Sequence, residues 1–201
     1  MKDDKHLDSK ISNNKNNILN ESKKLFSQKG FDGTSIGQIA KNAGVTKGLI
    51  FHYFYSKEVL WKSVKSAFIS PNSAGETLDV SAGLAVFLTK IIERRFTTYT
   101  QHPELVRMML WQHLQRDKET LAGIDAPLYS PTHWGEAINM LQAQGELRDD
   151  MTVEMIILFI ANSVSAVFTQ DYFEISQDKN ALLLYQDKII DCLYLALRPK
   201  K

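Results

Sequence analysis

The chain has 201 residues, of which 44% are hydrophobic, 10% aromatic and 23% charged, a composition typical of globular proteins and not of disordered or fibrous ones. Its longest apolar run, residues 155–161, is far shorter than the roughly 20 residues of a membrane-spanning helix, so no membrane role is expected. The polar residues 1–14 lack the apolar stretch of a secretory signal. A single cysteine, Cys192, cannot form an internal disulfide, and we expect it to be a core residue of a cytoplasmic protein.

The net charge of +1 conceals an uneven distribution along the chain. Residues 1–66 carry 12 lysines and six carboxylates, a net charge of +6, whereas the remaining residues carry a net charge of −5. A basic segment attached to an acidic remainder is typical of a head that binds a polyanion. A solvated lysine-rich surface is the alternative, and charge alone does not separate the two.

Glycine and proline divide the chain into stretches of helical periodicity, without the alternation typical of strands, which predicts an all-α fold. Residues 1–14 are expected to form a disordered arm before a first helix that ends at Gly30. A second helix follows, with Ser35 and Gln38 at the spacing of a capping box. It ends at Gly44, and Thr46 is predicted to cap a third helix.

The second and third helices, joined by a very short turn, form the pattern of a helix-turn-helix. Ile50 and Phe54 lie one turn apart and are predicted to point inward, which leaves an apolar and aromatic face outward. That face is understandable if it enters a DNA major groove. Leu49 could contact a thymine methyl, Lys47 could reach a guanine edge or a phosphate, and Gly48 would allow close approach of DNA.

The segment 31–60, FDGTSIGQIAKNAGVTKGLIFHYFYSKEVL, resembles the DNA-binding head of TetR-family transcriptional regulators, and the resemblance covers roughly residues 18–60. It implies phosphate contacts from Thr34 or Ser35, Tyr53 and Lys57. It also implies that Lys47, Gly48, Leu49 and His52 lie at or near the base edges. Phe51 stands where the family usually has tyrosine, so a hydroxyl that could bond to DNA is missing. The expected DNA-binding residues are Thr34, Ser35, Thr46, Lys47, Gly48, Leu49, Phe51, His52, Tyr53 and Lys57.

The domain boundaries expected from this pattern are a helix-turn-helix domain over residues 15–62 and a ligand-binding and dimerisation domain over 63–201. Loops are predicted at 70–73 and 123–131. The predicted helices of the second part are 57–69, 80–100, one from Pro103, one from 130 or 131 to near Gly145, 152–173 and 179–197.

The last two of these helices are apolar nearly all round, which indicates burial on two sides and hence a second subunit. The residues expected in the homodimer interface are Ile160, Val164, Phe168, Ile189 and Leu193. Residues that could line a ligand cavity are apolar or aromatic with a few polar groups among them, although each one taken separately is more often an ordinary core residue. They are Phe87, Ile91, Phe96, Tyr99, Met108, Trp111, Gln112, His113, Trp134, Phe159, Asn162 and Ser163.

The leading hypothesis is a homodimeric regulator that binds a near-palindromic site in double-stranded DNA. By the resemblance it is a repressor, released by a small and largely apolar or aromatic effector. An enzyme is not expected, because no nucleophile and base pair, glycine-rich phosphate loop or metal-ligand spacing is present, and no cofactor or metal is expected either. A helical adaptor that binds another protein is the alternative, but it leaves the outward face of the third helix unexplained.

Overall fold

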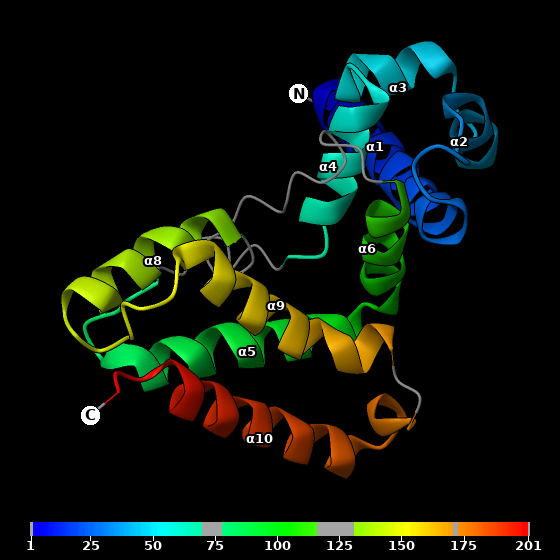
Figure 1. The fold of residues 1–201 in the computed structure, drawn as a ribbon. Coiled ribbons are helices and arrows are strands. Elements are labelled where there is room, and N and C mark those ends of the chain that lie inside the picture. The colour runs from blue at the N-terminus through cyan, green and yellow to red at the C-terminus, as the bar shows by residue number, and fades with distance from the viewer. Residues whose placement is uncertain (1, 70–77, 116–130, 171–172, 201) are drawn as a thin grey trace. The chain divides into compact units, whose positions relative to one another are not determined.

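The computed structural model describes residues 2–69, 78–115, 131–170 and 173–200, with the backbone alone for 2–12 and 131–132 (Figure 1). Every regular element in these ranges is a helix, as the sequence predicts. In the described part of the chain, no helix is long and apolar enough to cross a membrane. The predicted loop at 70–73, and the predicted loop at 123–131 except for Pro131, lie outside the described residues; Pro131 is the first residue of a helix.

The chain divides into two compact units, and each is described by itself. The first consists of Met1–Ile69 with Pro103–Ala122, and the second of Ser70–His102 with Gly123–Lys201. This division differs from the expected boundary at residue 62, because a helix from the middle of the chain packs with the N-terminal helices. Contacts between residues distant in sequence, which helical periodicity does not reveal, determine this grouping.

The first unit contains α1 (Lys2–Lys29), α2 (Ile36–Ala43), α3 (Lys47–Phe54), α4 (Lys57–Ser66) and α6 (Pro103–Gln115). Residues 2–14, which we expected to be a disordered arm, continue α1 instead. Its core joins aromatic rings from three segments: Phe26 lies 5.0 Å from Trp61 between ring centroids, and Phe31 lies 5.7 Å from the same ring. Phe26 and Trp61 are fully buried, so this cluster holds α1 against α4.

The second unit contains α5 (Gly83–Gln101), α8 (Pro131–Ala143), α9 (Val153–Thr169), a 3₁₀ turn at Ile175–Gln177 and α10 (Lys179–Leu197). Helix α5 packs against both α9 and α10, and α8 packs against α9 (Figure 1). Helix α9 begins after its N-cap Thr152 and ends at Thr169, before the predicted end at Phe173. Asp178 caps α10 by accepting from two backbone N–H groups.

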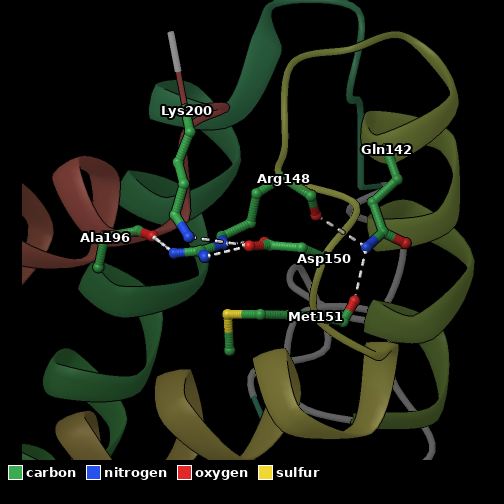
Figure 2. Close-up of polar contacts among 6 residues, drawn as sticks. All are labelled: Gln142, Arg148, Asp150, Met151, Ala196 and Lys200. Carbon is green, nitrogen blue, oxygen red and sulfur yellow. Dashed lines mark hydrogen bonds and ion pairs between the residues drawn. The ribbon is translucent and has the colours of Figure 1, made fainter.

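Side chains attach the loop between α8 and α9 to the C-terminal end of α10 (Figure 2). The Arg148 guanidinium donates to the Asp150 carboxylate and, at 2.9 Å, to the carbonyl of Ala196. Lys200 also contacts Asp150 at 3.1 Å, and these two cations hold the pKa of the Asp150 carboxyl well below its usual range. The Gln142 amide donates to two carbonyls of the same loop. This loop is therefore attached to α8 through Gln142 and to α10 through Arg148.

Candidate nucleic-acid interface

The turn between α2 and α3 has the defined geometry that a helix-turn-helix requires. The Ser35 and Gln38 capping box begins α2, and Gly44 ends it in the left-handed region with φ of 66°. The Thr46 hydroxyl oxygen accepts from the Leu49 N–H at 3.2 Å and caps α3. These caps are confirmed as predicted, and Ile50 and Phe54 are buried beneath them. Helix α3 thus has a defined start directly after α2 and a buried inner face.

The outer face of α3 carries the side chains expected to meet DNA. Lys47, Gly48 and His52 are exposed, Phe51 is 44% exposed, and Leu49 is half-buried. A Cβ placed on Gly37 of α2 would lie 3.1 Å from the Cε atom of Lys47, so the lysine stem crosses α2 at this glycine. A Cβ placed on Gly48 would meet only the Thr46 hydroxyl, at 3.9 Å. Gly48 therefore has no packing role that requires glycine.

Tyr55 is a candidate that the sequence analysis did not select. It ends α3 with a positive φ of 59°, and its side chain is 81% exposed. A non-glycine residue in this backbone region is uncommon and indicates a constrained turn. The exposed phenol lies directly after the α3 residues and before the Ser56 cap of α4. No sequence signal distinguished it from Tyr53, which is half-buried.

Thr34 has a structural position that does not suit a phosphate contact. Its side chain is 1% exposed, and its hydroxyl lies 2.8 Å from the Gly30 carbonyl and 3.2 Å from the Leu25 carbonyl. The hydroxyl therefore satisfies the C-terminal end of α1. Of the two neighbouring residues proposed for this contact, only Ser35 is exposed.

Lys57 is only partly available to solvent. Its Nζ atom lies 4.2 Å from the centroid of the Phe31 ring, and burial lowers the pKa of its ammonium group from the ordinary value. The carboxylates of Asp32 and Glu58 oppose this shift. Lys57 thus has a packing role in the head in addition to its expected contact with phosphate.

Three polar side chains of α6 bond to α1, to α4 and to the backbone of Phe31 in the turn before α2. The Trp111 indole N–H donates to the carbonyl of Ser27 at 3.3 Å, and the Gln115 amide oxygen accepts from the Phe31 N–H at 3.3 Å. Lys65 of α4 donates to the Gln112 amide oxygen at 3.1 Å. Trp111 and Gln112 were expected to line a ligand cavity, but within the first unit they instead join α6 to α1 and α4.

The other expected ligand residues fall into separate groups. Five of them form part of the interior of the second unit and are at most 4% exposed: Phe87, Ile91, Phe96, Tyr99 and Trp134. Met108 and His113 lie on α6 in the first unit. On α9, Phe159 is 54% exposed and Ser163 is half-buried. Asn162 is exposed, and its amide donates to the Leu158 carbonyl within the helix.

The expected dimer residues are largely core residues of one chain. Ile160 and Val164 are fully buried, Ile189 and Leu193 are at most 9% exposed, and Phe168 is half-buried against the rings of Phe96 and Tyr99. The first four of these side chains are therefore buried within a single chain. The apolar side chains that do remain exposed on the same helices are Met155, Leu158 and Phe159 of α9, and Leu183, Leu184, Tyr194 and Leu195 of α10. Cys192, expected in the core, is also exposed.

Known proteins share both the head and the second part of this sequence. Residues 18–64 match the family profile for bacterial regulatory proteins of the tetR family, and residues 88–182 match a tetracyclin repressor-like C-terminal domain. The chain is 31% identical over 157 residues to the HTH-type transcriptional repressor NicS of Pseudomonas putida, covering 74% of this chain and 72% of NicS. The chain belongs to the TetR family. As a TetR-family member it is a DNA-binding transcriptional regulator and not an enzyme.

Similarity to other TetR-family regulators extends over most of the chain. It is 28% identical over 200 residues to IcaR of Staphylococcus epidermidis, the negative transcriptional regulator of the biofilm operon icaADBC, covering 92% of this chain and 99% of IcaR. The crystal structure of HlyIIR, a hemolysin II transcriptional regulator, superposes with a TM-score of 0.64 at 20% identity, covering 94% of this chain and 99% of HlyIIR. The expected fold, a helix-turn-helix head with a helical body, is confirmed.

Proposed function

We propose that this TetR-family regulator is a homodimeric repressor that a small molecule releases from a near-palindromic operator. The observation that carries the proposal is the outer face of α3, where Lys47, Gly48, Phe51 and His52 remain exposed on a helix capped and packed on its inner side. NicS and IcaR, which resemble the chain in sequence, are a repressor and a negative regulator, and this supports repression. Binding to chromosomal DNA would place the protein in the cytoplasm.

The dimer is supported by the exposed apolar side chains of α9 and α10. Leu158 and Phe159 on α9, and Leu184 and Leu195 on α10, are each more than half exposed. Apolar side chains gathered on two helices that pack against each other are typical of a surface that a second protein covers. In the proposed dimer these helices pair with the same helices of a partner, an arrangement in which both subunits use one surface. Two heads would then reach major grooves roughly 34 Å apart.

Helix α6 supplies a means of communication from the ligand to the head. It follows α5 after a single residue, His102, and its side chains bond to α1, α4 and the Phe31 backbone. A ligand that favours one position of α6 would therefore favour one position of the head. A coupling of about 1–3 kcal/mol would change the affinity for DNA by roughly 5- to 150-fold.

The test is a titration of DNA binding against salt concentration, with a duplex selected by the protein from a random-sequence pool. Affinity should fall steeply with salt, because each phosphate contact releases bound counterions. Lys47→Ala should weaken binding, whereas Lys188→Ala removes an exposed lysine of α10 and serves as the control. Leu49→Ala should cost about 1 kcal/mol on the selected sequence and less on unrelated sequences. Binding that is insensitive to salt, or equal loss from both lysine variants, would contradict the proposal.

A further inference from the structure

We infer that Gly37 of α2 positions Lys47 of α3 close to Ser35, so that Lys47 and Ser35 bind one backbone phosphate of DNA together. The inference rests on the proposed binding of an operator, and it deepens that proposal in two ways. The sequence allows Lys47 either a guanine edge or a phosphate, and the structure favours the phosphate. Gly37, which the sequence analysis did not select, becomes a positioning residue.

The first observation is the space above Gly37. A Cβ placed on this residue would lie 3.1 Å from the Cε atom of Lys47, 3.5 Å from its Nζ atom and 3.7 Å from the Ser35 hydroxyl oxygen. The first of these distances is shorter than the roughly 3.5–4.0 Å of an ordinary contact between carbon atoms. The missing side chain therefore lets the stem of Lys47 lie on α2. It also leaves the ammonium and the hydroxyl next to the same point.

The second observation is that the head offers the Lys47 ammonium no partner of its own. No hydrogen bond or ion pair joins Lys47 to a residue in the part of the chain that the structure describes. Lys47 is the first residue of α3, where the helix dipole disfavours a cation, and neither α2 nor α3 has an acidic residue in its first turn. A lysine here does not stabilise the helix-turn-helix, and an external anion is the partner that suits it.

The position on α2 favours a phosphate over a base. In a helix-turn-helix bound to DNA, the second helix enters the major groove and the first helix crosses the backbone. The Ser35 oxygen accepts from the Gln38 N–H at 3.2 Å, so its hydroxyl proton remains available to an acceptor. Ser35 is also the exposed member of the pair for which the resemblance implies a phosphate contact. An ammonium and a hydroxyl next to one point match the two unesterified oxygens of a phosphate.

The experiment is a double-mutant cycle on the full chain, read by fluorescence anisotropy with the selected duplex. Lys47→Ala should weaken binding by roughly tenfold or more, because it removes a charge-assisted hydrogen bond. Gly37→Ala should weaken binding by roughly 3- to 10-fold, because the added Cβ displaces the lysine stem. It should not lower the free energy of unfolding, because alanine favours the helix and the exposed lysine can move. In the Lys47→Ala background, Gly37→Ala should have little further effect.

Modified duplexes distinguish a phosphate from a base as the ligand of Lys47. Methylphosphonate, which removes the charge of a single phosphate, is introduced at each position of the site in turn. At one phosphate in each half of the site, this change should weaken the wild type but not Lys47→Ala. Replacing guanine by 7-deazaguanine, which lacks the N7 acceptor, should affect both proteins equally. The slope of log affinity against log salt should fall by about 0.9 for each phosphate contact that Lys47→Ala removes.

Two controls make the same changes elsewhere in the chain. Gly135→Ala alters a glycine of α8, where the added Cβ would meet only Val153 at 3.5 Å, and Lys188→Ala removes an exposed lysine of α10. Neither should change the affinity for DNA. The inference is overturned if the effects of Gly37→Ala and Lys47→Ala add, since the Cβ then acts on DNA directly, or if 7-deazaguanine removes the effect of Lys47→Ala. A wild-type chain that binds no duplex would contradict the proposed function as well, whereas either of the first two results with DNA binding intact would contradict only this inference.

Discussion

A substitution at Gly48 can distinguish a glycine that DNA binding requires from a glycine that folding requires. Because a Cβ at this position meets only the Thr46 hydroxyl, at 3.9 Å, Gly48→Ala should be accommodated in the folded head. Alanine is also a better helix former than glycine, so the free energy of unfolding should rise by about 0.5–1 kcal/mol. If DNA approaches α3 closely here, the same change should weaken DNA binding. The measurements are urea unfolding and fluorescence anisotropy with labelled duplex, and tighter binding by the variant would contradict close approach.

Lys65 makes the stability of the head depend on pH. It is 3% exposed, and burial, together with the nearby charge of Lys62, lowers the pKa of its ammonium group to about 8. The folded chain therefore releases this proton at a lower pH than the unfolded chain, whose lysine has a pKa near 10.5. Raising the pH from about 8 towards 10.5 consequently favours the folded state, by about 1.4 kcal/mol per pH unit at most.

The comparison that isolates this effect uses Lys65→Met, which removes the titrating group. Urea unfolding at pH 7 and 9.5 should show the wild-type chain gaining stability relative to Lys65→Met as the pH rises. Lys41→Met removes an exposed lysine of α2 and provides the control. Equal pH dependence of the wild type and Lys65→Met would show that the ammonium group is not desolvated in the folded head.

At the scale of elements, the junction between α1 and α6 depends on Gly30. It ends α1 with φ of 70°, and a Cβ there would lie 2.9 Å from the Trp111 ring. Gly30→Ala should therefore combine backbone strain with displacement of α6. Gly44→Ala supplies a matched control, because Gly44 has φ of 66° with no atom within 4 Å of the added Cβ. Gly30→Ala should be the more destabilising of the two by about 1–3 kcal/mol.

The same pair of variants tests whether α6 conveys the effector signal. If Gly30→Ala and Gly44→Ala lower the free energy of unfolding equally, the Trp111 ring moves away from the added Cβ at no energetic cost. Where Gly30→Ala remains folded, its affinity for DNA should respond less to the effector than that of Gly44→Ala. An unchanged response would contradict a role for the α1 and α6 contact in switching.

At the scale of the whole molecule, the subunit contact is tested on exposed side chains. Leu158→Glu on α9 and Leu184→Glu on α10 replace side chains that are 60% and 59% exposed, so each should fold as a single chain. Both should shift the dimer towards monomer in light scattering and weaken binding to a two-site duplex. Met140→Glu on α8 changes a 53% exposed apolar side chain outside these helices and should leave the dimer intact. A dimer that persists in both variants would place the interface elsewhere.

Charged substitution of Ile160 has a different expected outcome. This side chain is fully buried within one chain, so Ile160→Glu should unfold the second unit before it could report on the dimer. Circular dichroism would distinguish loss of helix from dissociation of folded subunits. Folded monomers of Ile160→Glu would show that this part of α9 is less closely packed than the single chain indicates.

The sequence by itself determined the helix-turn-helix. The capping box of Ser35 and Gln38, the left-handed Gly44 and the Thr46 cap all act over four residues or fewer, so their spacing in the sequence specifies their geometry. The inward pair Ile50 and Phe54 follows from helical periodicity in the same way. For this reason the head and its family could be recognised before any tertiary contact was known.

Only the tertiary structure decided which apolar or polar side chains remain accessible. Thr34 bonds to the carbonyl of Leu25, nine residues earlier, and Trp111 bonds to that of Ser27, 84 residues earlier, so local sequence reveals neither contact. Helix α9 is apolar nearly all round, and periodicity alone could not show that Ile160 faces its own chain while Leu158 faces outward. Arg95 and Trp134 likewise come together from two helices. Local interactions depend on spacing along the chain, whereas burial depends on which distant segments pack together.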